Sequence, residues 1–172
     1  MLRRFSTLRT RLAALAVTLL CATLSFGQTA PAKAVSGNTF RVAVDGLTCT
    51  AVAPNTFEAL SFQIGVTDSI GTAGAPSGKI VLGDLLVQKA PDGCSVPLVA
   101  LTTAGKTVKR VVLTEVDKAN RPVLTITLDN VLIVAAQATG SQSADAVEQL
   151  DFFYSTLTIT DAAGNTTGSI GR

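Results

Sequence analysis

Three carboxylates stand close together near the C-terminal end of the chain, at Asp145, Glu148 and Asp151. A pair of carboxylates can act as general acid and general base, and a cluster of them can bind Ca²⁺ weakly. The spacing of these three matches no calcium-binding loop, because such a loop places its ligands at fixed alternate positions. We therefore expect a solvated strand edge here rather than a catalytic or metal site.

The residue types on which most enzymes rely are missing from the sequence. It contains no histidine, so it has no Ser–His or Cys–His pair and no histidine metal ligand. Its glycines between residues 65 and 78 lack the spacing and the following helix of a phosphate-binding loop. We expect no enzyme activity, no catalytic residue, no cofactor and no metal.

The first 27 residues have the layout of a secretory signal peptide. Four arginines and no acidic residue begin the chain, an apolar run over 12–26 follows, and small residues come next. That run is shorter than the roughly 20 residues that span a bilayer, although a short membrane anchor is the alternative interpretation. We predict cleavage before Gln28, or as late as before Val35, and a linker over 28–38.

Removal of the signal reverses the net charge of the protein. Residues 28–172 hold 10 of the 14 basic residues and all 12 acidic ones, so the mature chain carries 10 − 12 = −2. A short basic cluster at Lys106, Lys109 and Arg110 is interpreted as a solvated or subunit-contact surface. Because the mature chain has no long basic face, we expect no nucleic-acid partner, and no membrane contact after cleavage.

Cys49 and Cys94 are the two cysteines outside the predicted signal. Export to an oxidising compartment favours a disulfide between them. Free cysteines are also common in protein cores, so two buried thiols are the alternative. The sequence does not decide between these two states, because it does not give the distance between the Cα atoms.

Short runs of alternating apolar and polar residues fill the chain from residue 39 to residue 160, the pattern of half-buried strands. The segment 94–105 instead predicts a helix of about two to three turns, with Ser95 as its cap and Gly105 as its end. The last residues, 161–172, are rich in Gly, Thr and Asn and predict a flexible tail. The predicted strands cover residues 40–44, 60–64, 80–87, 108–116, 124–134 and 150–159.

Three of these strands change the parity of their apolar residues once, at residues 83–84, 129–130 and 155–156. One extra residue turns every later side chain to the opposite face, and a β-bulge restores the inward face while it bends the strand. Three bent strands favour a mainly β fold, a small β-barrel of about six or more strands with one short flanking helix. The alternative is that each position is the end of one strand and the start of another.

The order of these elements resembles the Hcp family, the tube protein of type VI secretion systems, over residues 40–160. Four consecutive blocks carry the resemblance, together with the Val-Asp-Gly that ends the first predicted strand at 44–46. The first block is SGKIVLGDL at 77–85 with a trailing Lys89, and the second is the helix at 95–105 with Lys106 after it. The third, LTITLDNVL at 124–132, is similar to the family's ITLEDV strand. The fourth, EQLDFFYSTLTIT at 148–160, follows the pattern of the family's closing strand.

The resemblance implies a β-barrel flanked by one helix, and six-subunit rings that stack into a hollow tube. It also implies a secreted protein whose ring can carry small effectors. Two features depart from the family. The family's tubes assemble in the cytoplasm and need no cleavable signal, whereas this chain is predicted to begin with one. The loop over 47–57 of this chain is also shorter than the loop through which the family's rings stack. The signal itself predicts a periplasmic or extracellular protein.

These observations predict an exported structural assembly protein whose main partner is a copy of itself, in a homo-oligomeric ring. The outward residues Thr125, Thr127 and Thr158 are small and favour strands, so we expect them at the subunit contact. The alternative is a monomeric secreted β-domain with an adhesin or surface-binding role. The size of the native protein separates a six-fold ring from a monomer.

Overall fold

A computed structural model describes residues 37–49, 51–70 and 76–172. The predicted signal peptide, both cleavage positions and nearly all of the linker lie outside the described residues. Within the described ranges, no helix is long and apolar enough to cross a membrane. All described residues belong to one compact unit.

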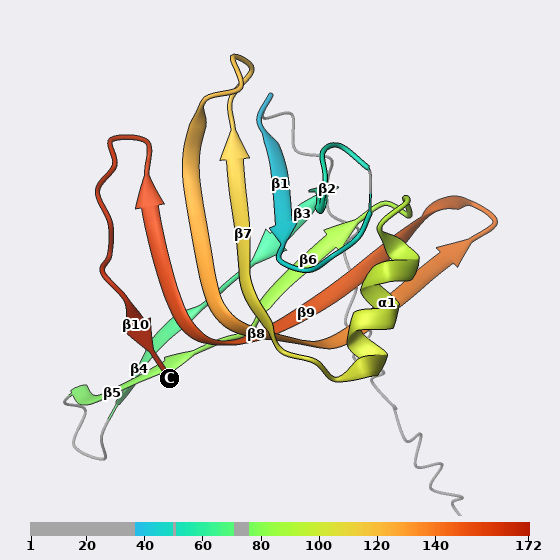
Figure 1. The fold of residues 1–172 in the computed structure, drawn as a ribbon. Helices are drawn as coiled ribbons and strands as arrows, with labels where there is room; N and C mark the ends of the chain where they lie inside the picture. Colours follow the sequence, from blue (N-terminus) through green and yellow to red (C-terminus); the bar gives the residue numbers. More distant parts are fainter. Residues whose placement is uncertain (1–36, 50, 71–75) are drawn as a thin grey trace, which may run out of the picture. The chain divides into compact units, whose positions relative to one another are not determined.

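The described residues form a mainly β fold with one short helix (Figure 1), which confirms the predicted fold class. The long strands β8 and β9 pair along most of their length at the centre of the main sheet, with β7 beside β8 and β6 beside β9. The elements in chain order are β1 (Thr39–Val44), β2 (Thr56–Ala59), β3 (Ser61–Gln63), β4 (Val66–Ile70), β5 (Pro76–Leu82), β6 (Leu85–Lys89), α1 (Ser95–Ala104), β7 (Val108–Val116), β8 (Pro122–Ser141), β9 (Ala144–Asp161) and β10 (Ile170–Gly171).

The main sheet runs in the order β2-β1-β7-β8-β9-β6-β3, with β10 added at the edge of β9. Its two end strands, β2 and β3, are consecutive in the chain and are separated only by Leu60. β2 pairs with β1, β3 pairs with β6, and the N–H of Leu60 donates to the carbonyl of Gln88 at 2.7 Å. One continuous segment therefore pairs with β1 at one end of the sheet and with β6 at the other.

The parity change predicted at 129–130 and 155–156 is present, but its cause is not a β-bulge. In β8, Leu128 and Val131 are both buried, and so are their partners in β9, Leu157 and Tyr154. The register is the same on both sides of the change, so neither strand carries an extra residue there. Asn130 has φ = 53°, a left-handed conformation that turns the backbone locally. The two strands therefore bend together.

β7 takes part in the same bend. Val108 and Val111 are buried, the two residues between them are exposed, and the register of β7 with β8 is unshifted through this stretch. Arg110, Asp129 and Thr156 consequently lie in one row across three strands, which we call the bend row. Figure 1 shows β8 and β9 curving strongly along their length.

The parity change at 83–84 is the end of one strand and the start of another, as the alternative interpretation proposes. β5 ends at Leu82 and pairs with β4 in a separate two-stranded sheet, whereas β6 begins at Leu85 and belongs to the main sheet. The N–H of Gly83 donates to the carbonyl of Gly65 at 2.8 Å. The hydroxyl of Tyr154 donates to the carbonyl of Gly83 at 2.7 Å. These bonds hold the base of the β4–β5 hairpin to the main sheet.

Helix α1 begins and ends close to its predicted positions. Gly105 follows its last residue with φ = 59°, in the left-handed conformation predicted for it. Cys94 is the N-cap and makes no side-chain capping hydrogen bond, so the prediction that Ser95 caps the helix is wrong. Ser95 is the first helical residue, and its hydroxyl accepts a hydrogen bond from the N–H of Asp92 at 2.9 Å. Leu98 is the helical residue buried in the core.

The segment 161–172, predicted as a flexible tail, has partners along β9 in the structure. β10 pairs with β9 beyond the stretch that pairs with β6. The guanidinium of Arg172 forms an ion pair with Asp84 and lies 4.2 Å from the ring centroid of Phe153 and 4.9 Å from that of Tyr154. The tail therefore covers part of the β9 edge that β6 does not reach.

Candidate assembly surface

The three threonines predicted at a subunit contact lie together on the outer face of the main sheet. Thr127 of β8 pairs directly with Thr158 of β9, and Thr125 pairs with Thr160. Thr125 also lies opposite Thr114 of β7. All five side chains are half-buried in the single chain. We call these five residues the threonine face.

Strand alternation places the threonine face outward. Ile126, Leu128 and Leu157, which alternate with the threonines, are buried, and successive residues of a strand point to opposite faces. Threonine is β-branched, so it fits a strand and presents only a methyl and a hydroxyl. The five threonines therefore form a small uncharged area of short side chains, with Arg41 of β1 directly opposite Thr114 at its edge.

Charged residues border this face at the bend row. Arg110 Nε donates to Asp129 Oδ1 at 2.7 Å, across β7 and β8. This hydrogen bond and the charge of Asp129 raise the pKa of Arg110 above its usual value. Lys106 and Lys109 are exposed. The structure therefore pairs one member of the predicted basic cluster and exposes the other two.

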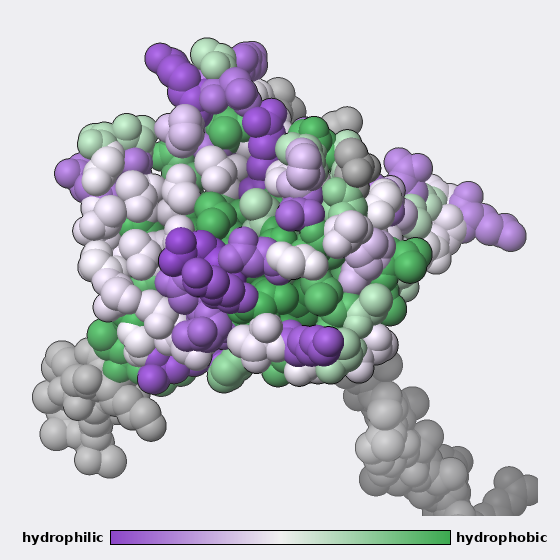
Figure 2. Space-filling view, viewed as in Figure 1, coloured by the Kyte–Doolittle hydropathy of each residue, from purple (hydrophilic) through white to green (hydrophobic). Residues whose placement is uncertain are grey.

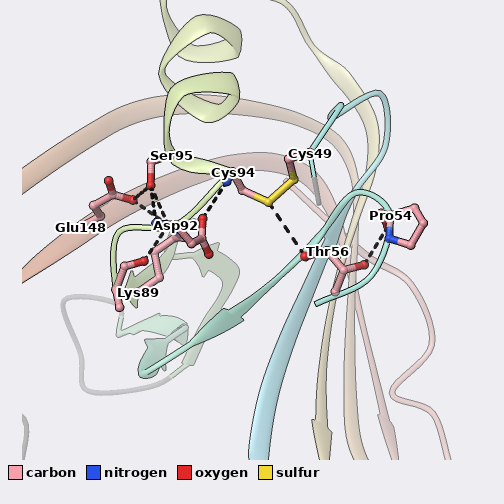
Figure 3. Close-up of a disulfide and its surroundings, with 9 residues drawn as sticks. Cys49, Pro54, Thr56, Lys89, Asp92, Cys94, Ser95 and Glu148 are labelled. Atoms are coloured by element: carbon pink, nitrogen blue, oxygen red, sulfur yellow. Dashed lines mark hydrogen bonds and ion pairs between the residues drawn. A yellow bond between two sulfur atoms is a disulfide. The ribbon is translucent and has the colours of Figure 1, made fainter. Parts of the chain in front are cut away.

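Lys89 is the only charged residue in the core of the described part of the chain. Its Nζ lies 2.7 Å from Glu148 Oε2 and 2.9 Å from Asp92 Oδ1. It also donates to the hydroxyl of Ser95 at 3.1 Å and to the carbonyl of Ala90 at 2.8 Å. Figure 3 shows how Lys89, Asp92, Ser95 and Glu148, here called the Lys89 network, connect the start of α1 with β6 and β9.

The three carboxylates near the C-terminal end do not form one site. Glu148 contacts Lys89, Asp145 is exposed, and Asp151 lies on the outer face between the buried Leu150 and Phe152. Residues three apart on a strand point to opposite faces, so Glu148 and Asp151 are on different sides of β9. The structure brings together no acid–base pair from this cluster.

Asp151 is in an unfavourable environment for a charge. Burial raises the pKa of its carboxyl above the usual range, and the charge of Asp84 raises it further. The charge of Arg172 acts in the opposite direction. Oδ1 of Asp151 is buried and accepts no hydrogen bond from the described part of the chain. The ionised carboxylate therefore costs free energy in the folded state.

Replacement of Asp151 with asparagine should stabilise the protein at neutral pH. The pKa of Asp151 is higher in the folded state than in the unfolded state. The free energy of unfolding is therefore highest when this carboxyl is protonated, below the unfolded pKa of about 3.9, and falls as pH rises through the folded pKa. Urea unfolding should show the variant to be more stable than wild type at pH 7, with the difference shrinking toward pH 3. Asp145→Asn, at an exposed position, is the control and should change little. A variant that is less stable at pH 7 would contradict this expectation.

The structure joins Cys49 and Cys94 in a disulfide, with their Cα atoms 5.0 Å apart (Figure 3). That separation lies in the range that a disulfide can bridge. Cys49 lies in the loop between β1 and β2, and Cys94 is the fully buried N-cap of α1. The bridge ties this loop to the start of the helix, beside the Lys89 network.

Solved structures of several bacterial proteins have this fold. Hcp1 from Salmonella typhimurium matches with a TM-score of 0.64 and 19% identity, over 76% of this chain and 91% of that one. A mutant of Hcp1 from E. coli EAEC 042 matches with a TM-score of 0.67 and 16% identity, over 78% and 98%. The secreted protein Hcp3 from Pseudomonas aeruginosa matches with a TM-score of 0.59 and 17% identity, over 78% and 98%. At these identities the likeness concerns the fold.

No curated protein matches the chain in sequence. A family model does match, and its description is "Type VI secretion system effector, Hcp". The matched residues, 35–160, make up most of the chain and include the threonine face, both cysteines of the disulfide and the Lys89 network. The family is a class of structural, non-enzymatic secretion proteins. The chain belongs to the type VI secretion system effector Hcp family.

Proposed function

We propose that the mature chain is an exported structural protein that assembles with copies of itself into a hexameric ring of the Hcp kind. The observation that carries this proposal is the threonine face, five half-buried threonines on three adjacent strands of an Hcp fold. A head-to-tail contact closes into a ring when its rotation fits a whole number of subunits. Such rings can stack into tubes or carry small secreted effectors.

The proposed place of action is the periplasm or the outside of the cell. An Arg-rich start followed by a short apolar run supports export through a cleavable signal. The Cys49–Cys94 bridge suits an oxidising compartment, where disulfides persist. One structure of the same fold is named as a secreted protein.

Replacement of Thr127 with lysine should break the ring without unfolding the domain. Thr127 lies on β8, the middle of the three strands that carry the threonine face, and pairs with Thr158. A long charged side chain there would keep neighbouring subunits apart, and burying its charge against uncharged residues is unfavourable. Light scattering should give a mass near six protomers for the wild type and a much smaller mass for the variant, while circular dichroism stays unchanged.

The matched control is Ala119→Lys, which adds the same charge to the exposed turn between β7 and β8. That variant should keep the size of the wild type. A wild type that stays monomeric at high concentration would overturn the ring proposal and favour a monomeric surface-binding domain instead. A ring that survives Thr127→Lys would place the subunit contact elsewhere on the fold.

A further inference from the structure

The β4–β5 hairpin leaves apolar side chains exposed near its base. Val66, Ile80 and Val81 are 45%, 51% and 47% exposed. Ile80 and Val81 are consecutive in β5, so both faces of the hairpin carry apolar residues. β4 and β5 form their own two-stranded sheet, and an isolated hairpin is only marginally stable in water. The hairpin therefore has the properties of an element that is completed by another surface.

A second apolar surface lies on and beside α1. Val96 and Val99 are 79% and 48% exposed, and no residue of the helix, SVPLVALTTA, is charged. A pocket of about 60 Å³ opens beside Val99. Its lining combines the apolar Ala136, Ala138 and Leu150 with the polar Ser95, Gln137 and Glu148. We call Val96, Val99, Ala136 and Ala138 the helix patch. Figure 2 shows hydrophobic residues gathered in the lower right of this view, where Figure 1 places α1.

These two apolar surfaces cannot meet within one chain. Figure 1 places the β4–β5 hairpin and α1 at different ends of the fold. The bonds from Gly83 to Gly65 and from Tyr154 to Gly83 hold the base of the hairpin in place. Two different patches at separate positions on one molecule make a heterologous contact between copies, which repeats from head to tail.

We propose that the β4–β5 hairpin of one copy docks on the helix patch of the next copy. The exposed residues of the hairpin and the helix patch are uncharged. Two acidic residues border the contact: Asp68 lies opposite Ile80 across the hairpin, and Glu148, which lines the pocket, is already paired with Lys89. A pocket of this size holds about two water molecules. It can equally take the branched end of one aliphatic side chain, such as Ile80. This inference rests on the proposed self-assembly and adds a second contact to the threonine face.

The experiment is disulfide cross-linking between two exported variants, Ile80→Cys and Val99→Cys, each of which adds one free cysteine and keeps the native bridge. When the two proteins are mixed and mildly oxidised, we expect a linked dimer that contains one copy of each. A protein that carries both substitutions should form a ladder of linked multimers on a non-reducing gel. The control pair, Ala119→Cys with Val99→Cys, should form no such dimer, since the exposed turn at Ala119 belongs to neither surface.

The outcomes separate this contact from the ring itself. A ladder that ends at six copies places the contact within a ring, and one that continues past six places it between rings; both support the docking. If the wild type has the mass of a ring but the variants link no more than the control pair does, the docking is wrong and the proposed function stands. A monomeric wild type overturns the proposed function and the docking with it.

Discussion

Replacement of Lys89 with methionine is expected to lower the free energy of unfolding by about 2–4 kcal/mol, slightly less than the usual cost of breaking a fully buried ion pair. Methionine keeps the apolar stem but removes the ammonium group, which leaves Glu148 and Asp92 without their cation. Their side chains are 15% and 25% exposed, so water reaches them in part and reduces the loss. Urea unfolding at pH 7 measures the difference.

A second substitution distinguishes the effect on stability of losing the ion pair from the effect of losing packing. In the double variant Lys89→Met with Glu148→Gln, no unpaired charge is left at position 148, so it should recover part of the stability lost in Lys89→Met alone. Arg121→Met is the surface control, because it breaks the ion pair with Asp117 on a side chain that is 78% exposed, and it should have a far smaller effect. Equal effects at Lys89 and Arg121 would contradict a stabilising role for the Lys89 network.

The sequence predicts the fold well where one local rule acts alone. β7 occupies the predicted residues 108–116, since its inward positions are all valine or leucine. α1 lies within the predicted 94–105, because Gly105 can take the left-handed conformation that ends a helix. Both features depend on residue types within a few positions of one another.

The prediction for 60–64 fails because partner strands decide it. Alternation of Leu60, Phe62 and Ile64 predicts one strand, but the structure has β2 before Leu60 and β3 after it, with Phe57 buried in β2. Leu60 is 50% exposed at the point where the segment leaves β1 and joins β6. No local pattern shows which strands a segment will join.

β8 and β9 are longer than predicted at the ends joined by their hairpin, and the reason there is different. Both strands extend past 134 and before 150 into a hairpin of small and polar residues that lacks apolar alternation. Backbone pairing continues to Ser141 opposite Ala144, and the register of the two strands shifts between Ile133 and Ala135. Main-chain hydrogen bonds extend these strands where side-chain hydrophobicity predicts nothing.

The threonine face and the Lys89 network differ in how far the sequence predicts them. Outward parity identifies Thr125, Thr127 and Thr158, and the register of β8 with β9 then places them side by side. The Lys89 network is absent from the sequence-based predictions, although one signal for it exists. Lys89 has the parity of the buried Leu85 and Val87, so it is a cation at an inward position. Its partner Glu148, 59 residues away, follows only from the register.

Loss of the Cys49–Cys94 bridge is expected to lower the free energy of unfolding by about 4 kcal/mol in the chain-entropy model. The bridge closes a loop between residues 45 apart in sequence, so it removes many conformations from the unfolded chain. It also joins the loop after β1 to the N-cap of α1, which has no side-chain capping bond of its own. Reduction should therefore loosen the start of α1 first, and with it the helix patch. Urea unfolding with and without reductant measures the loss of stability.

The matched comparison is the double variant Cys49→Ala with Cys94→Ala, which lacks the bridge in both buffers. Reductant should leave its unfolding midpoint unchanged while it shifts that of the wild type, because the added reagent acts on the protein only through this bond. Thiol labelling of exported, denatured and unreduced wild type should find neither Cys49 nor Cys94 reactive. Full labelling at both positions would show that the bridge does not form after export. A reductant-sensitive wild type with unreactive thiols would establish the bridge as the covalent anchor of α1.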